Sequence, residues 1–137
     1  MATNQQTVDR AAYELGYIEY GASLDATDAG DALNAFNDMM HEWKYRDMDF
    51  NWFTQDTLSD VAPVPAWASS GVISNLAVRL GAIFNVAISP ETVEKARVGK
   101  RTIGNTLMSQ SLGNTDMTNL PLGERVGTRY QIESDSI

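Results

Sequence analysis

The chain has 137 residues, a length typical of one domain or of one domain with a tail. It contains 10 Lys and Arg against 18 Asp and Glu, a formal net charge of -8. This balance argues against a general nucleic-acid binder, whose affinity comes from basic residues at phosphates. The lack of cysteine excludes disulfides, thiol catalysis and cysteine-ligated metals. The polar start, residues 1–7, predicts no signal peptide, and no apolar run approaches a membrane span.

The negative charge is concentrated in the first half of the chain. Residues 1–62 contain 12 acids and three bases, a net charge of -9, whereas residues 63–137 contain six acids and seven bases, a net charge of +1. Bases gather between Lys95 and Arg101. Most such charges simply lie on solvated helix faces. Opposite charge on two surfaces also predicts contact with a neighbouring copy or with another partner.

Two helices are expected in the acidic half. Apolar residues recur at helical spacing from Val8 to Leu15, with Thr7 as the expected N-cap. A longer amphipathic helix is predicted from Ala29 to Arg46, capped by Asp25 or Thr27. An aromatic segment follows, in which apolar and polar residues alternate only in part. We expect it to be irregular or β-hairpin-like.

Two further helices are expected after this segment. Residues 66–86 form the most apolar stretch, with Pro65 near its first turn, and its glycines Gly71 and Gly81 indicate close contact with another helix. Ser89 followed by Pro90 is the clearest helix start in the chain and predicts a helix to about Met108. The expected core residues of the whole bundle are Phe36, Met40, Trp43, Trp67, Ile73, Leu76, Leu80 and Phe84.

The fold class predicted from these patterns is all-α, a bundle of about four helices with the aromatic insertion and an extended C-terminal arm. We expect a helical domain over residues 1–108 and an arm over residues 109–137, where isolated apolar residues stand among glycines and polar residues. Such a segment has too little apolar surface for a separate domain and fits an arm that orders on a partner. A disordered tail is the alternative.

Catalytic motifs are missing from the sequence. His41 is the single histidine, and the zinc-protease pattern begun by His41 and Glu42 lacks its second histidine. Phosphate-binding glycine loops are also missing, and close pairs of carboxylates are expected by chance among so many acids. We therefore predict no catalytic residue, no cofactor and no metal site, and we interpret His41 as a surface or packing residue.

The order of these features resembles the tail accessory factor of short-tailed enterobacterial phages, also called the head-to-tail connector or packaged-DNA stabilisation protein. The resemblance spans residues 7–108. Its main matches are the helix that ends in Asn37–Trp43, Trp67 before Asn75–Leu80, and Ser89–Glu91 opening a basic helix.

The resemblance implies a mainly helical virion protein of the head-tail junction, made in the cytoplasm of the host bacterium. Members of this family form a ring, typically of twelve copies, below the portal protein. The ring extends the DNA channel, retains packaged DNA without binding it specifically, and provides the platform for a tail or nozzle protein. Their C-terminal segment clasps portal subunits, although residues 109–137 are shorter and richer in glycine than that pattern. Some members have been linked to cell-wall hydrolysis, for which this sequence has no motif.

The resemblance and the charge pattern together give three sets of candidate residues. The candidate portal-binding arm residues are Leu112, Met117, Leu120, Leu122, Val126, Tyr130 and Ile132. The candidate subunit-interface bases are Lys95, Arg97, Lys100 and Arg101, and the candidate channel-lining acids are Asp38, Glu42, Asp47 and Asp49. Two other functions stay open: a small helical protein-binding adaptor with no viral role, and a hydrolase that uses paired carboxylates.

Overall fold

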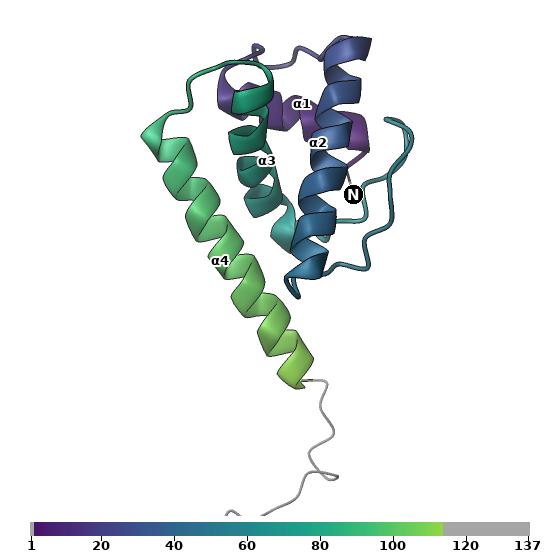
Figure 1. Ribbon diagram of the computed structural model, residues 1–137, viewed down its shortest axis with the longest axis vertical. Coiled ribbons are helices and arrows are strands. Elements are labelled where there is room, and N and C mark those ends of the chain that lie inside the picture. The colour runs from purple at the N-terminus through teal and green to yellow at the C-terminus, as the bar shows by residue number, and fades with distance from the viewer. Residues whose placement is uncertain (1, 114–137) are drawn as a thin grey trace, which may run out of the picture. The chain divides into compact units, whose positions relative to one another are not determined.

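The computed structural model describes residues 2–113, and this part of the chain is all-α. The helices are α1 (Asn4–Leu15), α2 (Ala26–Tyr45), α3 (Ser69–Ile83) and α4 (Pro90–Gly113), with a single 3-10 turn, η1 (Ala66–Ala68), before α3 (Figure 1). These residues contain no strand, and Thr3 and Val61 form an isolated antiparallel bridge. The chain forms two compact units that divide after Leu107, within α4, and the core belongs to the first unit.

The N-terminus of α1 lies one turn before the predicted start. Thr3, not Thr7, is the N-cap, because the Thr3 hydroxyl accepts a hydrogen bond from the N–H of Gln6 at 3.2 Å. The Gln6 side chain accepts in return from the N–H of Thr3 at 3.0 Å, which completes a capping box. Thr7 lies inside the helix and donates its hydroxyl to the Thr3 carbonyl at 3.0 Å. Apolar spacing missed this first turn because its residues are polar.

The other helix ends differ less from the prediction. Asp25 is the N-cap of α2 and accepts from the N–H of Asp28 at 2.8 Å, so the first of the two expected caps is confirmed. The α-helical part of the apolar stretch starts at Ser69, because η1 takes up the residues after Pro65. α4 starts at Pro90, as predicted, but continues past Met108 to Gly113.

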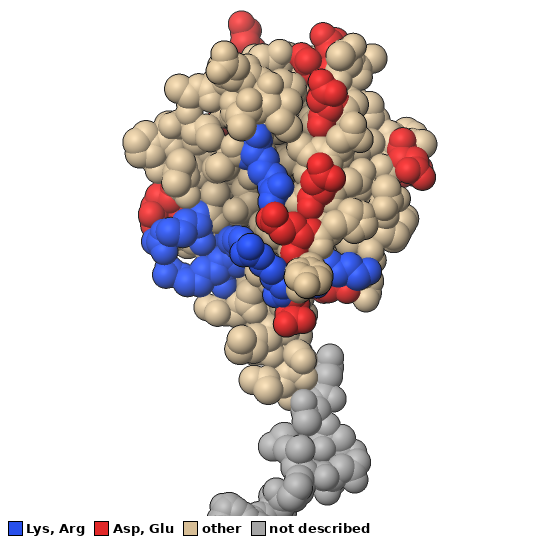
Figure 2. Space-filling view, in the orientation of Figure 1, with Lys and Arg blue, Asp and Glu red and all other residues tan. Residues whose placement is uncertain are grey.

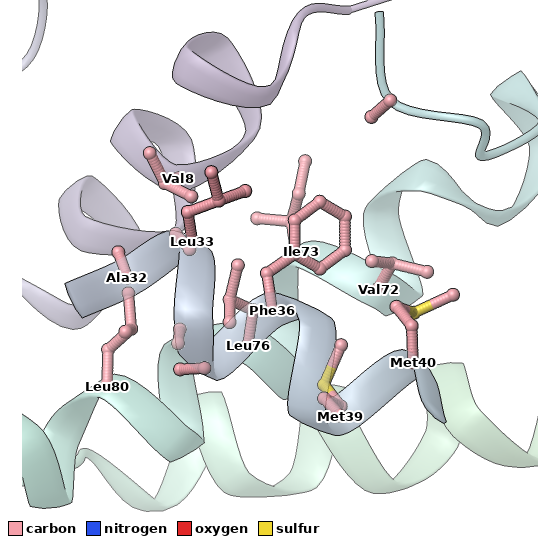
Figure 3. Packing of buried hydrophobic residues seen from close by; sticks show 14 of the residues in the cluster. Val8, Ala32, Leu33, Phe36, Met39, Met40, Val72, Ile73, Leu76 and Leu80 are labelled. Atoms are coloured by element: carbon pink, nitrogen blue, oxygen red, sulfur yellow. The ribbon is translucent and has the colours of Figure 1, made fainter. Parts of the chain in front are cut away.

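The core lies where α1, α2 and α3 meet. Figure 3 shows Val8, Phe36 and Ile73, one from each of these helices, pointing into the same cluster. Six of the eight expected core residues are buried here, with at most 2% of each exposed: Phe36, Met40, Trp43, Ile73, Leu76 and Leu80.

The two remaining expected core residues lie further out. Trp67 is 44% exposed, because η1 runs at the surface and the Trp67 ring meets Phe50 in an edge contact, with ring centroids 5.8 Å apart. Phe84 is partly buried and stacks on the ring of Tyr17 at 4.4 Å. Both residues cover the edge of the core, and neither fills its centre.

Helices α3 and α4 cross at a pair of glycines. A Cβ atom added at Gly99 would lie 2.7 Å from the Cα of Gly71, so the two backbones are in contact. Asn75 donates to the Gly71 carbonyl in its own helix at 2.8 Å and to the Ala96 carbonyl of α4 at 2.9 Å. The close helix contact predicted for Gly71 is confirmed. The same prediction for Gly81 is wrong, because a Cβ there would meet Ile88 and the Val86 carbonyl of the loop after α3. The crossing fixes the direction in which the outer side of α4 points.

The segment from Arg46 to Pro65 has neither helix nor strand and is held by buried amide side chains. Asn37 of α2 donates to the Gln55 carbonyl and accepts from the Gln55 N–H, both at 2.9 Å. Asn4 of α1 donates to the Gln55 side chain at 3.0 Å and to the Thr57 carbonyl at 2.8 Å. These bonds replace the backbone partners that a helix or a sheet would provide.

Candidate assembly surfaces

The outer side of α2 carries an acidic stripe. We use this name for Asp31, Asn34, Asp38, Glu42 and Tyr45, all exposed and spaced by three or four residues, which places them on one side of the helix. Figure 2 shows acidic side chains following α2 on this face. Helix α2 contains four acids and one base, a net charge of -3. The stripe is therefore an exposed acidic surface on the side of α2 that does not face the core.

A groove runs along the acidic stripe, between α2 and α3. Its volume is about 470 Å³, and it is lined by Asp31, Asn34, Ala35 and Asp38 of α2 and by Arg79, Ala82 and Ile83 of α3. Arg79 forms an ion pair with Glu42 across the groove, so its charge is compensated within the protein. Ile83 is 48% exposed. The groove thus combines an apolar side chain with two acids that have no ion-pair partner within residues 2–113.

The four candidate channel-lining acids occupy two different settings. Asp38 and Glu42 are one turn apart on the acidic stripe, and Glu42 is paired with Arg79. Asp47 and Asp49 follow the end of α2, where the chain turns. Asp47 has a left-handed conformation, with φ of 64°, and Asp49 accepts a hydrogen bond from the Trp52 N–H at 3.1 Å. All four are exposed, and the fold groups Asp38 with Glu42.

The four candidate interface bases also separate into two pairs. Lys95 forms an ion pair with Glu14 of α1 at 3.3 Å, and the Lys100 ammonium lies 5.7 Å from the centre of the Trp43 ring of α2. These two bases hold α4 against its own chain. Arg97 and Arg101, four residues apart, are exposed on another side of α4. Figure 2 shows basic side chains gathered on the face of the protein that it displays.

Arg97 has a local partner on its own helix. Its guanidinium bonds to Glu94 at 2.5 Å, and this hydrogen bond lowers the pKa of Glu94 and raises the pKa of Arg97. Both side chains are more than half exposed, so such a pair contributes little to stability and exchanges easily. Arg101 has no ion-pair partner within residues 2–113.

The candidate portal-binding arm lies mostly outside the described residues. Leu112 is in the last turn of α4 and is 67% exposed. The candidates that lie outside residues 2–113 are Met117, Leu120, Leu122, Val126, Tyr130 and Ile132.

No cluster of three or more His, Asp or Glu side chains within residues 2–113 is arranged to hold a metal ion. His41 is exposed on α2, and its Nε2 lies 3.0 Å from the Thr54 hydroxyl. Across the same residues, none of the helices combines the length and the hydropathy needed to span a bilayer. Two exposed features carry the separated charge, the acidic stripe with its groove and the basic side of α4.

Sequence reasoning missed part of this surface. Asp31, Arg79 and Ile83 were not among the candidates, although the spacing of Asp31 and Asp38 by seven residues already placed both on one side of a helix. Arg79 and Ile83 join them through the packing of α3 on α2, which no local pattern indicates. Comparison of the chain with protein-family models and with curated proteins gives no match.

Proposed function

We propose that this protein is a structural virion component, a head-to-tail connector that assembles as a ring beneath the portal protein. In this role the ring extends the DNA channel, helps to retain packaged DNA, and provides the platform on which a tail or nozzle protein is mounted. A ring of twelve copies is the expected size, from the resemblance of residues 7–108 to the tail accessory factors.

One observation carries the proposal: exposed charge of opposite sign is separated onto two helices of one small helical body. Helix α2 has a net charge of -3, and α4, with four bases and two acids, has a net charge of +2. Separation of this kind suits a protein that meets copies of itself, since complementary potentials guide and orient association.

Two finer parts of the proposal concern DNA and the portal. Exposed acids such as Asp47 and Asp49 would repel the phosphate backbone and let DNA slide without sticking. The arm, residues 109–137, would contact the portal through its isolated apolar residues, beginning with Leu112 at the end of α4. The aromatic segment from Phe50 to Phe53 would stay part of the connector body.

The test is electron microscopy of the full chain mixed with the portal protein encoded beside its gene. We expect a ring of density on one face of the portal, with Leu112→Asp and Leu120→Asp together weakening the attachment. Asn105→Asp, an exposed change on α4, is the matched control for added charge. A chain that leaves the portal bare under all conditions would contradict the proposal and favour a helical adaptor with another protein partner.

A further inference from the structure

The groove between α2 and α3 is built to receive an apolar side chain flanked by positive charge. Ile83 is exposed at the groove, and Asp31 and Asp38 lie two turns apart along its α2 side. The one base in the groove, Arg79, is held by Glu42 and leaves the two aspartates uncompensated. A ligand that fits this surface therefore carries a small apolar group together with cations.

The outer side of α4 has this composition. Val98 is 38% exposed and lies beside Arg101 around the helix axis, within about one turn of both arginines. Arg97 forms an ion pair only with Glu94, and both of these side chains are exposed. Arg101 has no ion-pair partner in the described part of the chain. The long arginine side chains can reach acids spaced more widely than the turn itself.

Helix α4 cannot reach the groove of its own chain with this side. The contact of Gly71 with Gly99 and the bond from Asn75 to the Ala96 carbonyl fix α4 along α3. The ion pair of Lys95 with Glu14 adds a second attachment. These contacts take the inner side of the helix, and the opposite side is left for another molecule.

We propose that the outer side of α4 in one copy, Arg97, Val98 and Arg101, docks in the groove of a second copy, between Asp31 and Asp38 and against Ile83. A second copy is the occupant because the same chain carries both surfaces, with complementary charge and an exposed apolar side chain in each. The contact joins two different surfaces, so each copy keeps one of each free and the contact repeats from copy to copy. This inference rests on the proposed function only in taking a second copy as the partner.

The first test is a mixed disulfide between two variants of the full chain. The chain has no cysteine, so a disulfide can form only between introduced residues. Asn34→Cys lies in the groove, and Asn105→Cys lies one turn beyond Arg101; both keep every charged residue. Mixed in equal amounts, they should form the mixed disulfide several-fold faster than Asn34→Cys with Ser23→Cys, an exposed loop position. Equal rates for the two mixtures would overturn the proposal.

The second test exchanges the charges of the two surfaces. The Asn34→Cys variant receives Asp31→Lys with Asp38→Lys, and the Asn105→Cys variant receives Arg97→Glu with Arg101→Glu. Circular dichroism checks that each variant folds. Reversing one surface should abolish the excess of mixed disulfide, and reversing both should restore it. The excess should also fall with added salt, since the Debye length shrinks from about 10 Å at 0.1 M to about 3 Å at 1 M. If the excess of mixed disulfide persists after one surface is reversed, the proposed surfaces are wrong.

Portal binding separates this inference from the proposed function. If the two cysteine variants form a ring on the portal but show no excess of mixed disulfide in that complex, the interface is overturned and the connector role stands. The opposite result, a strong excess without any portal binding, supports the interface and contradicts the connector role. If Asp31→Lys with Asp38→Lys loses portal binding while the mixed disulfide never forms, the groove binds the portal, and the second copy is the wrong occupant.

Discussion

The crossing of α3 with α4 and the segment from Arg46 to Pro65 are attached to the same helical core by opposite means. The crossing depends on side chains that are missing, because only glycine at positions 71 and 99 lets the two backbones touch. The segment depends on side chains that are present, because Asn37 and Asn4 supply the hydrogen bonds that its irregular backbone lacks. Close packing of helices and amide bonding of a loop thus work side by side in one small protein.

The difference has a consequence for assembly. The crossing sets the direction of Arg97, Val98 and Arg101, whereas the segment contributes none of the groove residues. Loss of the segment's hydrogen bonds should therefore cost stability and leave the assembly surfaces in place. A change at the crossing should disturb the outer side of α4 even where its cost in stability is small.

The largest expected effect is on the segment, from Asn37→Ala. This change leaves the buried N–H and carbonyl of Gln55 without their partner, and each orphaned group costs about 1–3 kcal/mol. We expect the free energy of unfolding to fall by roughly 2–5 kcal/mol in urea titrations. Asn34→Ala, an exposed change on the same helix, should stay within about 0.5 kcal/mol of the parent. Equal losses for the two variants would show that the amide bonds do not hold the segment.

Two glycine-to-alanine changes on α4 should shift the free energy of unfolding in opposite directions, each by less than Asn37→Ala does. A Cβ at Gly99 meets backbone, so Gly99→Ala should lower the free energy of unfolding, because overpacking costs about 1–3 kcal/mol against about 1 kcal/mol gained in helix propensity. Gly104→Ala meets only the Met48 sulfur at an ordinary 3.8 Å and should raise it by up to about 1 kcal/mol. Thermal melts of the two variants and of the parent measure both changes.

The same two alanine variants also test the link from the crossing to assembly. Gly99→Ala should reduce the mixed disulfide between Asn34→Cys and Asn105→Cys, because α4 must move away from Gly71. Gly104→Ala should leave it unchanged. If both variants form the disulfide as the parent does, the crossing does not control the position of the outer side of α4.

An effect of similar size is expected where the segment leaves α2. Asp47 has a φ of 64°, a conformation that glycine adopts freely and that β-branched residues avoid. Asp47→Val should lower the free energy of unfolding by about 1–2 kcal/mol, whereas Asp47→Gly should stay within about 0.5 kcal/mol of the parent. Urea titration of both variants measures the difference, and a valine variant as stable as the glycine variant would contradict the backbone argument.

Local patterns predicted more of the helices than of the surfaces. The apolar stripe of α2, the caps at Asp25 and Ser89 and the close contact at Gly71 can all be read from neighbouring residues, because helix periodicity and capping act within one or two turns. Thr3 was not predicted as the N-cap of α1, because its capping partner Gln6 lies in a polar turn that no apolar spacing marks. Trp67 was expected in the core because the sequence does not reveal that a surface 3-10 turn carries it.

The sequence by itself determined a helical domain, an acidic first half, and a basic cluster on its fourth helix. The tertiary structure decided which charges are free for a partner: Lys95 meets Glu14 across 81 positions of the chain, while Arg101 is left exposed. It also decided that Ile83 shares a groove with Asp31 and Asp38. The physical reason is range, since periodicity and caps depend on residues a few positions apart, whereas ion pairs and grooves depend on segments that only the folded chain brings together.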